Sequence, residues 1–198
     1  GNYFIENFES LNIKPIIIFR HPISQARSCI RNKWGHIYYP YMDSIYFRSK
    51  YLDDEKYKLF MEIDLNGTEL EKGVLDWFCS NAYLLKCWKE YPTIFYENLI
   101  INPIITSEKL KDTWGIKINL NKINDASGSS VFSENNFKEN IKSEDFKKTH
   151  LKNAFKNIKE IDRINLNRIF KILGINIYAS DTYKPTINSE LVYKYSHD

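Results

Sequence analysis

The sequence predicts a single α/β domain in which a central parallel sheet lies between helices, in a three-layer arrangement. Residues 16–19 are an unbroken β-branched and aromatic run, which is typical of a strand buried on both faces of a parallel sheet. A helical pattern follows that run directly. A second short apolar run, TIFYE at residues 93–97, comes after a long amphipathic segment. Strands that alternate with helices in this way favour a parallel sheet covered by helices.

The expected positions of the helices and strands follow from the period of the apolar residues and from the Pro and Gly residues that end these elements. The first strand leads into a helix over residues 22–34, with Pro22 in the first turn, where its missing N–H is not needed. Residues 35–69, rich in tyrosine and charge, are expected to be irregular. A long amphipathic helix is expected over residues 70–91, and Pro92 ends it.

The second half of the chain is read in the same way. After the strand at residues 93–97, Thr106 or Ser107 is expected to cap a short helix that ends at Gly115. Residues 121–142 are expected to form an ordered loop. Two helices follow, and the last is expected to end at Gly174.

Composition limits the class of partner. The net charge of +3 comes from 28 basic and 25 acidic residues, a balance that does not indicate a nucleic-acid-binding surface. Any anionic partner is therefore expected to be small and bound locally. The three cysteines include no CxxC pair, which favours a reducing, cytoplasmic compartment. No apolar run is long enough to predict a membrane span.

The junction between the first strand and its helix predicts an anion site. Arg20 ends the strand, so its guanidinium lies at the carboxyl edge of the sheet, beside the positive end of the helix dipole. A helical wheel separates an apolar side (Ile23, Ala26, Ile30, Trp34) from a polar, cationic side (Ser24, Arg27, Ser28, Arg31). Arg20 and Ser28 together suit a phosphate monoester. The alternative is an ion pair of Arg20 at a strand end and a solvated Ser28.

The string IIIFRHPISQARS, residues 16–28, resembles the segment with which PAPS-dependent sulfotransferases bind the 3′-phosphate of their sulfate donor, 3′-phosphoadenosine 5′-phosphosulfate (PAPS). In that family a hydrophobic strand ends in Arg, then Asp, Asn or His, then Pro, and a Ser stands eight residues after the Arg. Arg20, His21, Pro22 and Ser28 occupy those places. The resemblance implies a three-layer, P-loop-type sulfotransferase fold, in which Arg20 and Ser28 hold the 3′-phosphate.

Two further strings resemble the same family in the expected order. PTIFYENLIINP, residues 92–103, is similar to the strand and turn that place a Tyr near the adenine, which here is Tyr96. The alternative for Tyr96 is an aromatic residue inside a strand. GSSVFSENN, residues 128–136, is similar to the Ser and Phe segment of the adenine pocket and points to Ser130 and Phe132.

The chain also departs from the family. No strand with a phosphate-binding loop for the 5′-phosphosulfate precedes residue 16, so we expect residues 1–198 to be one sulfotransferase-like domain that lacks its N-terminal part. The general base of the family lies upstream as well, so no catalytic residue is assigned. The late glycine-rich segment is replaced by NNFKENIKSEDFKK, where Lys138 or Lys142 is a candidate substitute and a solvated charged helix start is the alternative.

The resemblance implies transfer of the sulfuryl group from PAPS to a hydroxyl or amine of a carbohydrate or small molecule, with 3′-phosphoadenosine 5′-phosphate (PAP) as product and no bound metal. A non-catalytic sulfotransferase-like binding module and an ATP-dependent kinase of related α/β fold are the alternatives. His21 is expected to orient the strand–helix junction. His36 is a candidate acid or base, with a hydrogen-bonded surface histidine as the alternative.

Overall fold

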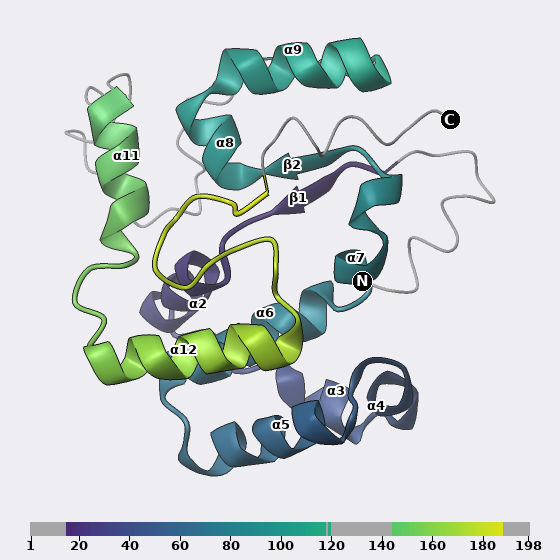
Figure 1. Ribbon diagram of the computed structural model, residues 1–198, viewed down its shortest axis with the longest axis vertical. Coiled ribbons are helices and arrows are strands. Elements are labelled where there is room, and N and C mark those ends of the chain that lie inside the picture. The colour runs from purple at the N-terminus through teal and green to yellow at the C-terminus, as the bar shows by residue number, and fades with distance from the viewer. Residues whose placement is uncertain (1–14, 118, 120–143, 188–198) are drawn as a thin grey trace.

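The chain folds into a mixed α/β structure that is mostly helical (Figure 1). The computed structural model describes residues 15–117, 119 and 144–187. Within them, two parallel strands lie between two groups of helices. Helices α8 (Tyr96–Ile101) and α9 (Pro103–Trp114) lie on one side, and helices α2 (Pro22–Arg31), α6 (Glu69–Asn81) and α12 (Glu160–Leu173) lie on the other. The predicted α/β class is therefore confirmed at this level, and the described residues contain a sheet of two strands only.

The sheet pairs the two apolar runs that the sequence singles out. Strand β1 spans Ile17–Phe19 and strand β2 spans Thr93–Phe95. Their register joins Ile17 to Thr93 and Phe19 to Phe95, in parallel. Phe19 is fully buried, and its ring lies 6.1 Å from those of Phe95 and Trp77. The sheet is small, but one face of it is anchored in the aromatic core.

Helices α2 (Pro22–Arg31) and α6 (Glu69–Asn81) pack closely behind the sheet. At their crossing, Gly73 of α6 faces Ala26 of α2, and a Cβ at Gly73 would lie 2.6 Å from the Cβ of Ala26. Two small residues therefore allow the two helix backbones to approach each other. This approach fixes the position of α2 on α6.

The prediction of an irregular segment over residues 35–69 is wrong. Three helices form there: α3 (Tyr38–Asp43), α4 (Ile45–Tyr51) and α5 (Asp54–Asn66). Ser44 caps α4 by accepting a hydrogen bond from the backbone N–H of Phe47, and Asp53 caps α5 in the same way through Lys56. Their buried side chains join the core: Tyr38, Phe47, Tyr51, Leu59, Phe60 and Ile63. The tyrosines thus serve both the core and the surface.

Three helix boundaries differ from those predicted. The helix expected over residues 70–91 ends at Asn81, and α7 (Leu84–Cys87) and the 3₁₀ turn η1 (Trp88–Glu90) complete that stretch. Thr106 lies buried inside α9, which begins at Pro103. The helix expected over residues 22–34 ends at Arg31, since Lys33 has a positive φ of 55°. The predicted helix ends at Gly115 and Gly174 are confirmed, and both glycines adopt left-handed backbone.

The C-terminal half packs back onto this framework. Helix α11 spans Glu144–Asn153 and α12 spans Glu160–Leu173. After α12 the chain (yellow in Figure 1) returns to the strand ends, with Ile177 and Tyr178 buried. The loop predicted over residues 121–142 lies outside the described residues.

Two expectations from the sequence concern membrane spans and disulfides. None of the helices in the described ranges has the length and apolar character needed to cross a bilayer. Cys29, Cys79 and Cys87 all lie within the described residues and form no disulfide.

The contact of α2 with α6 gives a stability prediction. Gly73→Ala is expected to lower the free energy of unfolding by about 1–2 kcal/mol, because the steric cost exceeds the gain in helix propensity. Gly35→Ala is the matched control, since a Cβ at Gly35 meets nothing within 4 Å. Urea denaturation of both variants measures the difference. Equal stability of the two would mean that the helices are not in close contact at Gly73.

Candidate functional site

The junction of β1 and α2 is built around His21, which is fully buried. Its Nδ1 accepts a hydrogen bond of 3.1 Å from the N–H of Ile23, so the ring caps α2. Its Nε2 lies 2.9 Å from the carbonyl oxygen of Ala179 and therefore carries the proton. Both ring nitrogens are satisfied by the neutral ring alone. Burial lowers the pKa of His21 to about 4, which keeps it in that form.

The backbone of the junction is held as well. Glu97, at the start of α8, accepts hydrogen bonds from the N–H of His21 at 2.9 Å and from the hydroxyl of Tyr178 at 2.8 Å. Burial raises the pKa of Glu97. On the opposite side, Trp77 Nε1 donates to the carbonyl of Arg20 at 2.8 Å. The expected role of His21 in orienting the junction is thus confirmed, and four segments of the chain share in it.

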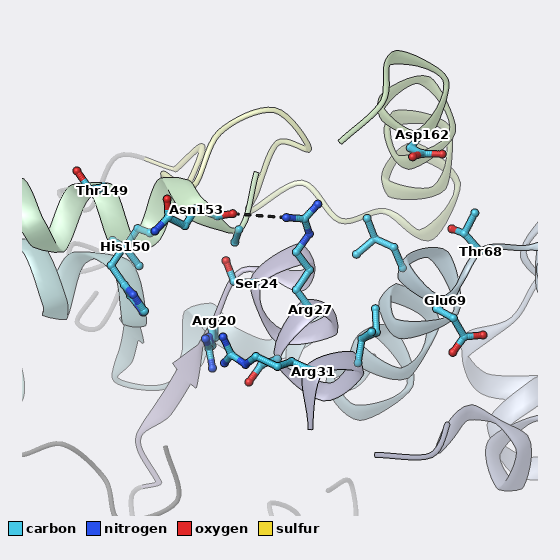
Figure 2. Close-up of a pocket in the computed structure, with 15 residues that line it drawn as sticks. Arg20, Ser24, Arg27, Arg31, Thr68, Glu69, Thr149, His150, Asn153 and Asp162 are labelled. Carbon is cyan, nitrogen blue, oxygen red and sulfur yellow. Dashed lines mark hydrogen bonds between the residues drawn. The ribbon is translucent and has the colours of Figure 1, made fainter. Parts of the chain in front are cut away.

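Beside this junction lies a cleft of about 840 Å³ between α2, the start of α6, α11 and α12 (Figure 2). One face of α2 lines it through Ser24, Arg27, Ser28 and Arg31, at the i, i+3, i+4, i+7 spacing of a helix face. Arg20 enters from the end of β1, and Thr149 and His150 enter from α11. The polar, cationic side of α2 predicted from the helical wheel is therefore the face that lines the cleft.

Arg20 and Ser28, the two residues predicted to hold a phosphate, line this same cleft. Tyr96 joins Arg20: the guanidinium carbon lies 5.1 Å from the centroid of the tyrosine ring. Tyr96 is the first residue of α8 and is half-buried, so the alternative of an interior strand aromatic is wrong. The structure thus places Arg20 and Ser28 in one cleft and brings Tyr96, 76 positions from Arg20 in the sequence, against the Arg20 guanidinium.

Arg27 has a structural partner. Its Nη1 donates to the carbonyl oxygens of Lys156 at 2.8 Å and of Asn153 at 3.4 Å, at the C-terminal end of α11. A cation suits that end of a helix. Arg27 therefore positions α11 across the cleft from α2, as the dashed line in Figure 2 indicates for Asn153.

The apolar side of α2 is only partly as predicted. Ile23 and Ala26 are buried against the core, whereas Ile30 is 38% and Trp34 68% exposed. The reason is the end of the helix at Arg31, after which the chain leaves the helical period. The buried contact face of α2 is therefore confined to its first half.

The cleft is electrically asymmetric. Arg20, Arg31 and His150 gather at one end, and Thr68, Glu69 and Asp162 lie at the other (Figure 2). A smaller cavity of about 290 Å³ adjoins it and includes His36. The His36 ring nitrogens lie 2.7 Å from Asp76 and 3.1 Å from Glu69. The hydrogen-bonded alternative for His36 is thus observed, and the cationic end of the larger cleft remains the candidate anion site.

Ser130 and Phe132, predicted for the adenine pocket, lie outside the described residues, as do Lys138 and Lys142. His150 and Ser24 are two of the cleft residues that sequence reasoning did not assign. His150 lies on a helix whose position relative to α2 no local pattern reveals. For Ser24 the signal was its place on the polar side of the wheel, four residues before Ser28.

Comparison with protein-family models, with curated protein sequences and with solved structures finds no match for this chain. Within the described ranges, no group of three or more His, Cys, Asp or Glu side chains is arranged to hold a metal ion.

The state of His21 predicts a pH dependence. Because its pKa falls from 6.5 to about 4 on folding, the unfolded chain binds more protons between these values, and stability is lost as the pH falls through them. The contribution is about 3 kcal/mol. Equilibrium unfolding in urea, followed from neutral pH to pH 4, measures it.

His21→Asn is the matched variant, since its side-chain oxygen can still accept from Ile23 N–H but does not titrate. The raised pKa of Glu97 acts in the opposite sense and is common to both proteins. We expect the stability advantage of the wild type over His21→Asn to shrink steadily below about pH 6.5. A pH-independent difference would contradict a buried neutral His21.

Proposed function

We propose that the protein is a sulfotransferase that transfers the sulfuryl group from PAPS to a hydroxyl or amine of a carbohydrate or small molecule. One observation carries this proposal: Arg20 at the carboxyl end of β1 and Ser28 on α2 line the same cationic cleft, and the ring of Tyr96, after β2, lies against the Arg20 guanidinium. The chain order and spacing of these residues resemble the donor-binding half of that enzyme family.

The geometry suits a phosphorylated nucleoside. Arg20 provides charge-assisted donors for a phosphate, and Ser28 provides a hydroxyl from the neighbouring helix. Tyr96 adds an aromatic ring beside Arg20, near which an adenine would lie. A nucleotide with a 3′-phosphate would present its phosphate to Arg20 and Ser28 and its base to Tyr96, whereas ATP lacks that phosphate. In this proposal the fold belongs to the three-layer, P-loop-type sulfotransferases, of which the described residues form the 3′-phosphate side.

The proposed reaction is an in-line displacement at sulfur. The acceptor oxygen or nitrogen forms a bond to the sulfur of PAPS as the bond from sulfur to the phosphate oxygen breaks, which releases PAP. The acceptor proton passes to a base, and the negative charge grows on the departing phosphate. Arg20 and Ser28 act before this step, because by holding the 3′-phosphate they fix the donor in position.

The donor site gives a direct binding prediction. By calorimetry, PAP is expected to bind more tightly than 5′-AMP, which differs by the 3′-phosphate alone. Arg20→Ala is expected to weaken PAP binding roughly 10- to 100-fold, the range for a hydrogen bond to a charged group with the attendant loss of charge, and to leave 5′-AMP little changed.

Arg48→Ala is the control. Arg48 lies on α4, away from the cleft, so that substitution removes one positive charge without touching the site. It is expected to bind PAP as the wild type does. Equal binding of PAP and 5′-AMP would overturn the proposal. A preference for ATP with Mg²⁺ would support a kinase instead, and PAP binding without sulfuryl transfer from PAPS to any acceptor would support a binding module.

A further inference from the structure

Two buried polar atoms at the cationic end of the cleft lack hydrogen-bond partners within the described residues: Ser24 Oγ and Arg20 Nε. Ser24 is only 7% exposed and lines the cleft from the first turn of α2. A buried hydroxyl without a partner lowers stability, so such atoms call for an explanation. Their position beside the helix N-terminus indicates a ligand that accepts hydrogen bonds.

His150 faces the same place from α11. In Figure 2 its ring lies at the same end of the cleft as Ser24, Arg20 and Arg31, and it is within electrostatic reach of both arginines. Desolvation of the ring, and then the positive charges of those two arginines, lower the pKa of His150. A ring with this pKa is mainly neutral at pH 7, and an anion placed between it and the arginines would favour the charged form.

The other charged groups near this end of the cleft do not take the place of an anion beside His150. Arg27 donates to the carbonyls at the end of α11. Glu97, on helix α8 that packs against α11, is within electrostatic reach of Arg20. Its two oxygens already accept hydrogen bonds from His21 and Tyr178. The carboxylates that line the cleft, Glu69 and Asp162, lie at its other end (Figure 2).

We propose that Ser24 and His150 complete the anion site with Arg20 and Ser28, so that a phosphomonoester dianion is bound between α2 and α11 and His150 takes up a proton on binding. This inference rests on the proposed function, in which the dianion is the 3′-phosphate of PAPS or PAP. Ser24 contributes a neutral hydrogen-bond donor at the start of α2. His150 contributes a positive charge, because it is protonated when the dianion is bound.

Ser24→Ala tests the first part with two readouts. PAP binding is expected to weaken roughly tenfold, the scale of a hydrogen bond to a charged group. The urea midpoint of the free protein is expected to stay the same or rise, because the substitution removes an unpartnered buried hydroxyl. Unchanged PAP affinity, or a clear loss of stability, would mean that the Ser24 hydroxyl serves the fold and would overturn its role in binding.

His150→Gln tests the second part by calorimetry in buffers of different ionisation enthalpy. At about pH 7, where a phosphomonoester is mainly a dianion, the wild type is expected to show net proton uptake when it binds PAP. His150→Gln is expected to show no uptake and several-fold weaker binding. Lys152→Gln, an exposed position on the same helix, is the control and should keep the wild-type proton uptake.

The outcomes separate the two proposals. A preference for PAP over 5′-AMP that Arg20→Ala abolishes, combined with unchanged affinity and proton uptake in Ser24→Ala and His150→Gln, would overturn this inference and leave the proposed function standing. Absence of that preference in the wild type would overturn the proposed function and this inference with it.

Discussion

The arrangement of this protein depends on one buried neutral imidazole. His21 accepts from the start of α2, donates to Ala179 in the C-terminal segment and, through its backbone N–H, holds Glu97 at the start of α8. Three parts of the chain, far apart in sequence, therefore meet at the end of β1. Because Arg20 directly precedes His21 and its carbonyl is held by Trp77, this clamp also sets the direction in which Arg20 leaves the strand.

The cleft follows from that clamp and from two helix contacts. The close approach of Gly73 to Ala26 seats α2 on α6, and Arg27 ties α2 to the end of α11. The polar face of α2 and the inner side of α11 are thereby held opposite each other, with cations gathered at the end nearest β1. In the proposed function the anion is bound where Arg20 and the start of α2 meet, because the cationic side chains of the cleft gather there.

Local signals explain what the sequence predicted and where it failed. The ends of α9 and α12 were readable because Gly115 and Gly174 adopt backbone that other residues avoid. The helices between residues 35 and 69 were missed, although Ser44 and Asp53 are ordinary caps, because tyrosines and charges obscure the helical period there. The place of His150 in the cleft depends on how α11 packs against α8, and no pattern within α11 encodes that contact. The cleft was thus predictable from the strand–helix junction on one side only.

The clamp requires that His21 is neutral, with its proton on Nε2, and the nitrogen NMR spectrum of its ring as the pH is lowered tests this requirement. We expect ¹⁵N shifts typical of the Nε2–H tautomer, unchanged from about pH 7 down to about pH 5, where an ordinary histidine would already be charged. Charging of His21 near its ordinary pKa, or a proton on Nδ1, would contradict the clamp and with it the placement of Arg20.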